Sequence, residues 1–165
     1  MSHRPAGKIV PLAELLATVA ARRADGEQVV LTNGCFDLLH LGHVRCLAAA
    51  AELGDVLVVG INSDASVRAL KQASRPLMGE LERAEIVAAL ECVDYVTVFE
   101  ESTALELVRA VRPEVYVKGG DYAGKVLAEA DLARQLGGRV KLVPEVPGRS
   151  SSGLLRAIRD AAREG

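Results

Sequence analysis

Aromatic residues are scarce in this chain of 165 residues, which has no Trp, 3 Tyr and 2 Phe. Hydrophobic residues nevertheless make up 50% of the composition, so aliphatic side chains and alanine must build the core. Such a composition suits helices packed on a buried parallel sheet better than a sandwich held together by aromatic side chains. The length predicts a single domain that buries roughly 70% of its unfolded surface.

An excess of either charge is also missing. Lys and Arg number 20 and Asp and Glu number 22, giving a formal charge of −2. This balance excludes general binding to nucleic acid through a basic surface. No apolar run reaches the length of a membrane span, and Met1–Val10 contains no apolar signal-peptide core. We therefore expect a cytoplasmic protein with neither a nucleic acid nor a membrane as partner.

The three cysteines, Cys35, Cys46 and Cys92, have no metal-ligand spacing. Reduced thiols are the expectation for a chain without an export signal. Cys46 and Cys92 lie in apolar, helix-like runs, so we interpret both as core residues.

Strand-like and helix-like segments alternate along the chain. Five strands joined by helices predict a single doubly wound (Rossmann-like) parallel α/β sheet with helices on both faces. Residues 1–27 are interpreted as an N-terminal extension and helix, and residues 28–165 as the functional domain. Ligands bind beyond the carboxyl ends of the strands in such sheets. The predicted strands are 28–32, 55–61, 95–99, 115–118 and 139–143, and the predicted helices are 12–23, 41–53, 65–70, 80–91, 103–112, 127–136 and 153–163.

The first strand leads through residues 32–43, TNGCFDLLHLGH, into a helix. Gly34 permits a tight backbone approach, and the helix N-terminus offers free amides and the positive end of the dipole. His40 and His43 are expected to donate to phosphate oxygens there, while Gly42 between them leaves room for the ligand. An isolated H-x-G-H match would favour an ordinary first turn, but the position after the first strand favours a site.

Polar residues follow the second strand as well. At Asn62-Ser63-Asp64 the simpler interpretation is a helix N-cap, with Asp64 the favoured residue. Lys71 and Arg75 lie in a polar loop that is either solvated or a mobile phosphate lid. For Arg83, in the next predicted helix, a surface salt bridge to Glu80 is the simpler interpretation.

The last two strands end in further anion-binding patterns. Lys118-Gly119-Gly120 places either an ammonium beside a closely folded backbone or a surface lysine before an ordinary turn. Gly148-Arg149-Ser150-Ser151-Ser152 supplies a cation, three hydroxyls and free amides, and one of the serines is expected to be an N-cap. The convergence of several weak patterns at one sheet edge predicts an anion site.

These motifs resemble those of a known family. Residues 32–43 resemble the nucleotidyltransferase superfamily that includes cytidylyltransferases and pantetheine-phosphate adenylyltransferase. The chain from about Val29 onward further resembles the adenylyltransferase domain of bacterial ADP-heptose synthase, so residues 28–165 would form the nucleotidyltransferase domain. That closer resemblance rests on N-S-D-A-S at 62–66, Arg75-Pro76, Arg83, K-G-G-D-Y at 118–122 and G-R-S-S-S at 148–152.

The resemblance implies transfer of AMP from ATP to D-glycero-β-D-manno-heptose 1-phosphate, with Mg²⁺, giving ADP-heptose and pyrophosphate. No protein ligand for the metal is expected, because the phosphates would hold it. A homodimer is expected, and a separate heptose kinase would supply the substrate because the fused sugar kinase of many family members is absent. The implied catalytic residues are His40, His43 and Lys118. Those implied for ATP are Thr32, Asn33, Gly34, Cys35, Phe36, His40, Gly42, His43, Lys71, Arg75, Arg149, Ser150, Ser151 and Ser152, and those for the sugar phosphate are Asn33, Asp37, Asn62, Arg83, Gly119, Gly120 and Asp121.

Other functions fit the same motifs. A cytidylyltransferase for glycerol 3-phosphate or another polyol or sugar phosphate, and an FAD-forming adenylyltransferase, keep the chemistry and change the substrates. A non-catalytic nucleotide-binding regulatory module would bind ATP without releasing pyrophosphate. The family commonly shows Thr-Thr followed by Asn or Lys where this chain has Ser151-Ser152-Gly153, which keeps the hydroxyls and loses a polar side chain.

Overall fold

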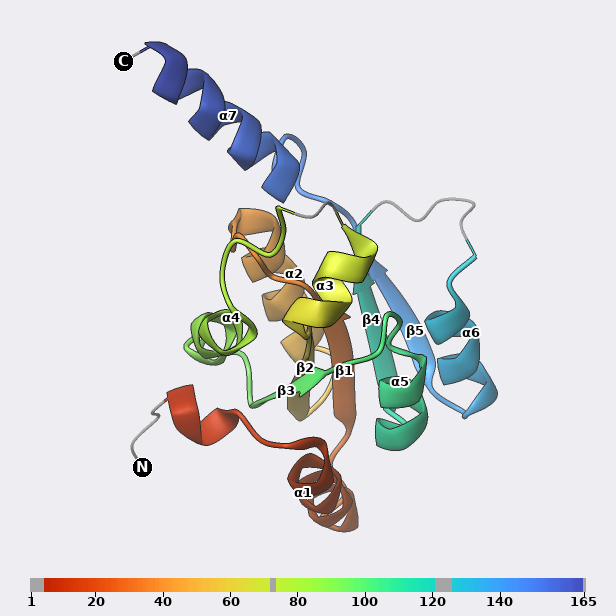
Figure 1. Cartoon of the computed structure of the whole chain (residues 1–165). Helices are drawn as coiled ribbons and strands as arrows, with labels where there is room; N and C mark the ends of the chain where they lie inside the picture. Colours follow the sequence, from red (N-terminus) through yellow and green to blue (C-terminus); the bar gives the residue numbers. More distant parts are fainter. Residues whose placement is uncertain (1–4, 72–73, 121–125, 165) are drawn as a thin grey trace.

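One sheet of five parallel strands, in the order β3-β2-β1-β4-β5, organises the molecule (Figure 1). A computed structural model describes residues 5–71, 74–120 and 126–164. β1 pairs with β2 on one side and β4 on the other, so the winding direction changes there and a crevice is expected beyond the strand ends. The predicted doubly wound sheet is confirmed. The strands are β1 (Val29–Gly34), β2 (Val56–Asn62), β3 (Tyr95–Phe99), β4 (Val115–Gly119) and β5 (Arg139–Val143).

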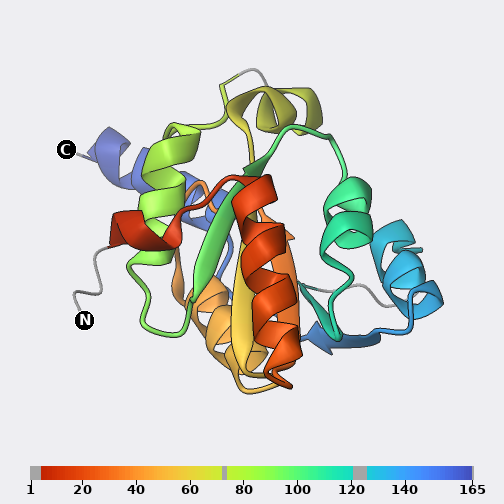
Figure 2. The same ribbon diagram turned by 90° about the horizontal axis from the view of Figure 1, so that it is seen from below.

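Helices cover both faces of the sheet and enclose two apolar cores. Val29 and Leu31 belong to the core under α1, α5 and α6, whereas Val30 belongs to the core under α2 and α4. Figure 2 shows α1 lying in front of the strands. Alternate side chains of one strand thus pack into opposite cores, which explains the continuous apolar runs in the sequence. The helices are α1 (Leu12–Ala24), α2 (Leu41–Ala51), α3 (Asp64–Leu70), α4 (Glu80–Ala88), α5 (Leu105–Val111), α6 (Ala128–Gln135) and α7 (Ser151–Glu164), preceded by the 3₁₀ helix η1 (Pro5–Lys8).

The segment before β1 packs into the body of the domain. Leu15 and Val19 of α1 are buried in the same core as β1. The Val10 amide donates to the Val96 carbonyl at 2.9 Å, and Ile9 forms a parallel bridge with Val96. The division between residues 1–27 and 28–165 stays a prediction, although α1 shares its core with the sheet.

Several elements begin or end at residues other than those predicted. β1 continues to Gly34 and β2 to Asn62, so the first residues of both motifs are still held in the sheet. α4 ends at Ala88 rather than at residue 91. The ammonium of Lys8 donates to the carbonyls of Leu90 (3.1 Å) and Val93 (2.7 Å), which satisfies backbone acceptors beyond that helix.

The C-terminal helix α7 differs from the others in how little of it is covered. It extends away from the sheet, with the C-terminus at its far end (Figure 1). Ile158 in its middle is 57% exposed, whereas Leu154 and Leu155 near its start are half-buried. Only the first turns of α7 therefore contact the body of the domain.

Candidate active site at the carboxyl ends of the strands

A cavity of about 410 Å³ lies beyond the ends of β1 and β4. Its "histidine wall" is Thr32, Asn33, Gly34, Phe36, His40, Gly42, His43 and Cys46, from β1 and the start of α2. Its "serine wall" is Pro144, Glu145, Val146, Arg149, Ser150, Ser151 and Ser152, from the β5–α7 connection and the first turn of α7. Lys71, Lys118, Gly119 and Gly120 complete the lining.

The rings of His40 and His43 stack at the N-terminus of α2, with centroids 3.8 Å apart. His40 is the N-cap, and its Nδ1 accepts a hydrogen bond from the Gly42 amide at 3.1 Å. Nδ1 of His43 accepts from the His40 amide at 3.3 Å. Because both Nδ1 atoms are acceptors, the proton of each neutral ring resides on Nε2. The fold thus selects one tautomer for both imidazoles and leaves each with a single Nε2–H donor.

The surroundings of both histidines lower their pKa values and so favour the neutral form at pH 7. Burial, together with the charges of His40 and Lys71, lowers the pKa of His43 to about 4, against an opposing effect of the Leu38 backbone. Burial also lowers the pKa of His40, against the opposing charge of Glu145. A second proton on Nδ1 would also break the hydrogen bonds from the backbone amides.

Positive groups outnumber the one carboxylate, Glu145, in the rest of the described cavity lining. Lys71, Lys118 and Arg149 line it, and the N-terminus of α7 opens onto it through Ser151 and Ser152. Lysine ammoniums, an arginine guanidinium and helix-terminal amides all favour anions. The arrangement therefore suits a ligand with several phosphate groups.

Hydrogen bonds of the serine wall begin the last helix. The Gly153 amide donates to Ser150 Oγ at 3.0 Å, so Ser150 caps α7 as expected of one of the three serines. Ser151 Oγ donates to the Leu38 carbonyl at 3.5 Å, which links the first turn of α7 to the loop between β1 and α2. Ser150 thus has a local structural role that leaves Ser151 and Ser152 as the hydroxyls of the first turn.

Two glycines allow close packing within the site. A Cβ on Gly42 would lie 2.8 Å from the His40 ring, so this glycine makes room for the imidazole itself as well as for a ligand. A Cβ on Gly119 would lie 2.7 Å from Cys46 Sγ. A larger residue at either position would displace a group that lines the cavity.

Several predicted site residues lie behind the cavity rather than on its surface. Asn62 Nδ2 donates to Ser66 Oγ at 2.8 Å, and the Asn62 side chain is buried. Arg75 forms an ion pair with the buried Asp37, with Nε and Oδ2 2.6 Å apart. Direct contact of these residues with substrate stays a prediction. Cys35 and Arg83 are likewise outside the lining, and Asp121 lies outside the described residues.

The simpler interpretation of Arg83 as a surface residue is wrong. Its side chain is fully buried and pairs with Asp64 rather than with Glu80, at 2.7 Å. The carboxylate of Glu80 instead accepts from the Asp64 amide at 2.7 Å. Asp64 is also not the N-cap of α3: Ser63 Oγ accepts from the Ser66 amide at 3.1 Å. The Asp64 carboxylate is thereby free to neutralise a buried arginine.

Sequence reasoning missed Cys46 and the segment 144–146 as parts of the cavity. Cys46 was interpreted as a core residue; it packs against the core and also lines the cavity. It follows His43 by three residues, one helical turn on the same face, which is the signal that would have found it. Glu145 follows β5 directly, and among the described lining residues it is the one carboxylate. All three cysteines are free thiols.

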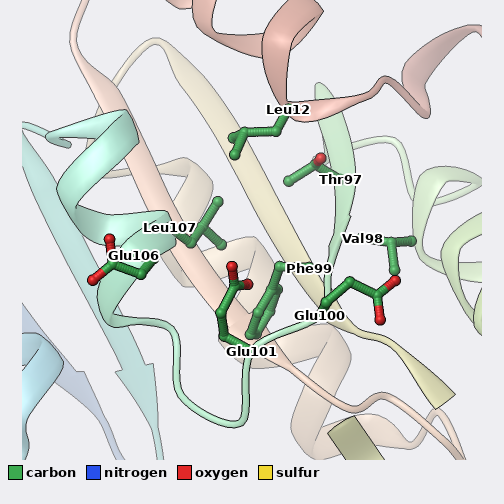
Figure 3. Close-up of a pocket in the computed structure, with 8 residues that line it drawn as sticks. All are labelled: Leu12, Thr97, Val98, Phe99, Glu100, Glu101, Glu106 and Leu107. Atoms are coloured by element: carbon green, nitrogen blue, oxygen red, sulfur yellow. The ribbon is translucent and has the colours of Figure 1, made fainter. Parts of the chain in front are cut away.

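A second, smaller cavity of about 190 Å³ lies where α1, β3 and α5 meet (Figure 3). Leu12, Phe99 and Leu107 line it together with Glu100, Glu101 and Glu106. Its described lining includes three glutamates and no lysine or arginine. This charge would repel a phosphate ligand, so the two cavities are chemically distinct.

In the described parts of the chain, His, Cys, Asp and Glu side chains do not gather in threes that would hold a metal ion. None of the helices that the structure describes combines the length and apolar composition needed to cross a bilayer.

Comparison with known sequences identifies the family of this chain. The model of the family described as cytidylyltransferase-like matches residues 31–154. The bifunctional protein HldE of Trichlorobacter lovleyi is 50% identical over 159 residues, which cover 96% of this chain and 32% of that protein. HldE of Syntrophotalea carbinolica is 54% identical over 143 residues, 87% of this chain and 29% of that protein. The chain spans about a third of the length of these curated relatives.

Solved structures agree with the fold. The lipopolysaccharide core biosynthesis protein from Thermoplasma volcanium is 31% identical, with a TM-score of 0.59 over 73% of this chain and 98% of that chain. Pantoate-beta-alanine ligase from Francisella tularensis shares the fold alone, at 14% identity and a TM-score of 0.60 over 87% of this chain and 68% of that chain. The family match covers most of the sequence and both histidines, and on these grounds the chain belongs to the cytidylyltransferase-like family and is an enzyme of the nucleotidyltransferase class.

Proposed function

We propose that this enzyme transfers AMP from ATP to D-glycero-β-D-manno-heptose 1-phosphate, forming ADP-heptose and releasing pyrophosphate. The stacked pair of His40 and His43 carries the proposal, because two neutral imidazoles in one tautomer lie at a helix N-terminus beside a strongly cationic cavity. The relatives named HldE support a sugar-phosphate adenylyltransferase. The identity of the sugar phosphate rests on the resemblance of the motifs to the adenylyltransferase domain of ADP-heptose synthase.

The reaction exchanges one bond at the α-phosphorus of ATP. An oxygen of the sugar phosphate attacks this phosphorus, and the bond to the oxygen that bridges to the β-phosphorus breaks on the opposite side. That oxygen leaves with its electron pair in pyrophosphate. The attacking phosphate is already ionised at pH 7, so the step needs no general base. Catalysis then depends on placing two anions together and on stabilising the charge that moves to the leaving group.

The two histidines suit that task because their hydrogen-bonding state is fixed. Each offers an Nε2–H to oxygens of the reacting phosphates, while its Nδ1 is engaged by a backbone amide. Neutral donors need no change of protonation during the reaction. Donors positioned in advance for developing charge are the largest single contribution in many enzymes.

The cations and the first turn of α7 would hold the triphosphate. Lys71, Lys118 and Arg149 offset its charge, and Ser151 and Ser152 meet the β- and γ-phosphates at the helix N-terminus. Mg²⁺, when bound with the nucleotide, would neutralise further charge on the phosphate oxygens. With Glu145 as the one carboxylate in the described lining, the phosphates themselves would supply most of its ligands. Homodimer formation belongs to the same proposal.

The test is pyrophosphate release by the full chain with Mg²⁺, comparing ATP with CTP and heptose 1-phosphate with glycerol 3-phosphate and FMN. We expect release with ATP and heptose 1-phosphate. Release with CTP and glycerol 3-phosphate would replace the proposal with a cytidylyltransferase, and release with ATP and FMN with an FAD-forming enzyme. ATP binding without release for any acceptor would favour the regulatory module. The double variant His40→Asn, His43→Asn, prepared identically, controls for contaminating enzymes.

A further inference from the structure

Phe36, in the histidine wall, has a backbone conformation that is rare for its residue type. Its φ is 49°, in the left-handed region, and glycine does not occupy the position. Bulky side chains are outliers in this region, and such strain persists only where the surroundings impose it. Something must therefore hold the chain on both sides of Phe36.

Arg83 holds the residue before Phe36. Its Nη1 donates to the Cys35 carbonyl at 2.6 Å, and its Nε donates to the Met78 carbonyl at 3.0 Å. Nη2 pairs with Asp64 at 2.7 Å, so each of the three guanidinium nitrogens has a defined partner. Because Arg83 is fully buried, the planar guanidinium fixes the direction of the Cys35 carbonyl with little freedom.

Asp37, the residue after Phe36, is held through its own side chain. One carboxylate oxygen accepts from the Leu77 and Met78 amides at 2.8 and 3.0 Å. The other pairs with Arg75 Nε at 2.6 Å. The Met78 amide donates to Asp37, and the Met78 carbonyl accepts from Arg83. The two buried side chains are therefore both tied to the backbone of the same residue.

The strained backbone directs the Phe36 ring toward His43. The ring lies so close to Gly34 that a Cβ there would be 2.9 Å from it. Its centroid is 5.1 Å from that of His43, and the planes are inclined at 53°. His43 in turn stacks on His40. A change at the backbone of Phe36 would therefore reach both imidazoles through contacts between rings.

We propose that Arg83 and Asp37 are positioning residues that hold Phe36 in its left-handed conformation, so that the Phe36 ring fixes His43 for the transfer. Neither residue then needs to touch the sugar phosphate. The catalytic consequence rests on the proposed function of His43, whereas the effect on the His43 ring does not.

The experiment follows the two site histidines by NMR in the full chain and measures kcat and KM for both substrates. The chain has only 3 histidines, so single substitutions assign their signals. In Arg83→Gln the His43 pKa is expected to rise by about one unit as the ring becomes better solvated. We expect kcat to fall by about 10²-fold, with KM for the sugar phosphate changed less than about threefold. Arg109→Gln, an exposed change on α5, is the matched control and is expected to leave the His43 pKa and kcat unchanged.

A double-mutant cycle tests the route through Phe36. Phe36→Gly removes both the ring and the backbone strain, so adding Arg83→Gln in that background is expected to change neither the His43 pKa nor kcat further. Equal effects of Arg83→Gln in both backgrounds would overturn the proposal. So would a raised KM for sugar phosphate with an unchanged His43 pKa, the pattern of direct substrate binding. If Arg83→Gln does not fold, Asp37→Asn and Phe36→Leu take its place, and an unperturbed His43 in both would overturn the proposal. If the wild type releases no pyrophosphate, the proposed function fails, and the NMR measurements still test whether Arg83 and Asp37 position His43 through Phe36.

Discussion

The two walls of the cavity are built on strands of opposite character. β1, behind the histidine wall, is the central strand, and Val29–Leu31 are fully buried. β5, before the serine wall, is an edge strand whose side chains are mostly exposed. The buried Asp37 and Arg83 tie the loop that precedes His40 to residues 75–83. The serine wall is held by local bonds such as Arg149 N to Val146 O at 3.1 Å and by the longer bond from Ser151 Oγ to the Leu38 carbonyl at 3.5 Å.

This difference matches the tasks proposed for the two walls. Donors to a reacting phosphorus lose their effect when they move by an ångström, so they belong where the core fixes them. Groups that hold the outer phosphates tolerate adjustment, and loops at a sheet edge allow it. Variants of the histidine wall are therefore expected to lower kcat, and variants of the serine wall are expected to raise KM.

The largest effect is expected from His40→Ala. Losing one preorganised donor lowers kcat by about 10²–10³-fold, measured as pyrophosphate release at saturating substrates. Arg45→Ala changes an exposed residue on the same helix and is expected to keep kcat within about twofold, on the scale of ordinary surface changes. Equal turnover in the two variants would show that the histidine wall does not act on the reaction.

Asp37→Ala tests how firmly the histidine wall is anchored. Removing the carboxylate leaves two amides and Arg75 without their partner, so the free energy of unfolding is expected to fall by about 3 kcal/mol. Urea denaturation measures it. Asp131→Ala breaks an exposed pair with Arg134 and is expected to cost below about 1 kcal/mol. A similar cost for both would contradict a rigid wall.

Two glycine substitutions compare the walls directly. A Cβ on Gly42 meets the His40 ring at 2.8 Å, whereas on Gly153 it meets the end of the Ser150 side chain at 3.1 Å. Gly42→Ala is expected to reduce kcat by about tenfold because the imidazole shifts. Gly153→Ala is expected to keep kcat and to change the stability of α7 by less than about 1 kcal/mol, because crowding of the capping Ser150 Oγ offsets the gain in helix propensity. A reversed ranking of kcat would refute the comparison.

Ser151→Ala should act on binding. The loss of one hydrogen bond to an outer phosphate is expected to raise KM for ATP by about fivefold, with kcat nearly unchanged. Steady-state kinetics with varied ATP separate the two parameters. A fall in kcat comparable to that of His40→Ala would place Ser151 among the transition-state donors instead.

The smallest expected effect concerns pH. The pKa of His43 is lowered to about 4 in the folded state, so between pH 6.5 and 4 the unfolded chain binds more protons. The free energy of unfolding therefore falls as pH drops through this window. The partial exposure of His43 keeps the change modest. Thermal melting at several pH values is expected to show a flatter profile for His43→Gln; identical profiles would contradict the assignment.

The sequence revealed the sheet and the place of the site because both depend on local patterns. Strand-like runs rich in β-branched and aliphatic residues predicted strands at 95–99 and 139–143 with the observed bounds. Strand ends in a parallel sheet meet at one edge, so the motifs after the strands were expected together. Residues such as His43, Lys118 and Ser151 do line one cavity.

What the sequence could not predict are the pairings between distant residues. Arg83 sits one helical turn after Glu80, so an exposed pair was the local expectation, yet its partner Asp64 is 19 positions away. Asp64 was expected to cap α3, but the neighbouring Ser63 supplies the cap. The left-handed φ of Phe36 has no signal in its residue type. Each of these depends on packing that exists only when the whole sheet has formed.

The sparsely covered helix α7 begins at the cavity and extends into solvent, so its far end moves whenever its first turn changes direction. Its first turn carries Ser151 and Ser152 at the phosphate-binding edge, and its 14 residues span about 21 Å at the α-helical rise per residue. A tilt of the first turn by a tenth of a radian displaces the far end by about 2 Å over that length. A spectroscopic label near residue 163 thus reports, from solvent, how the serine wall settles around its ligand.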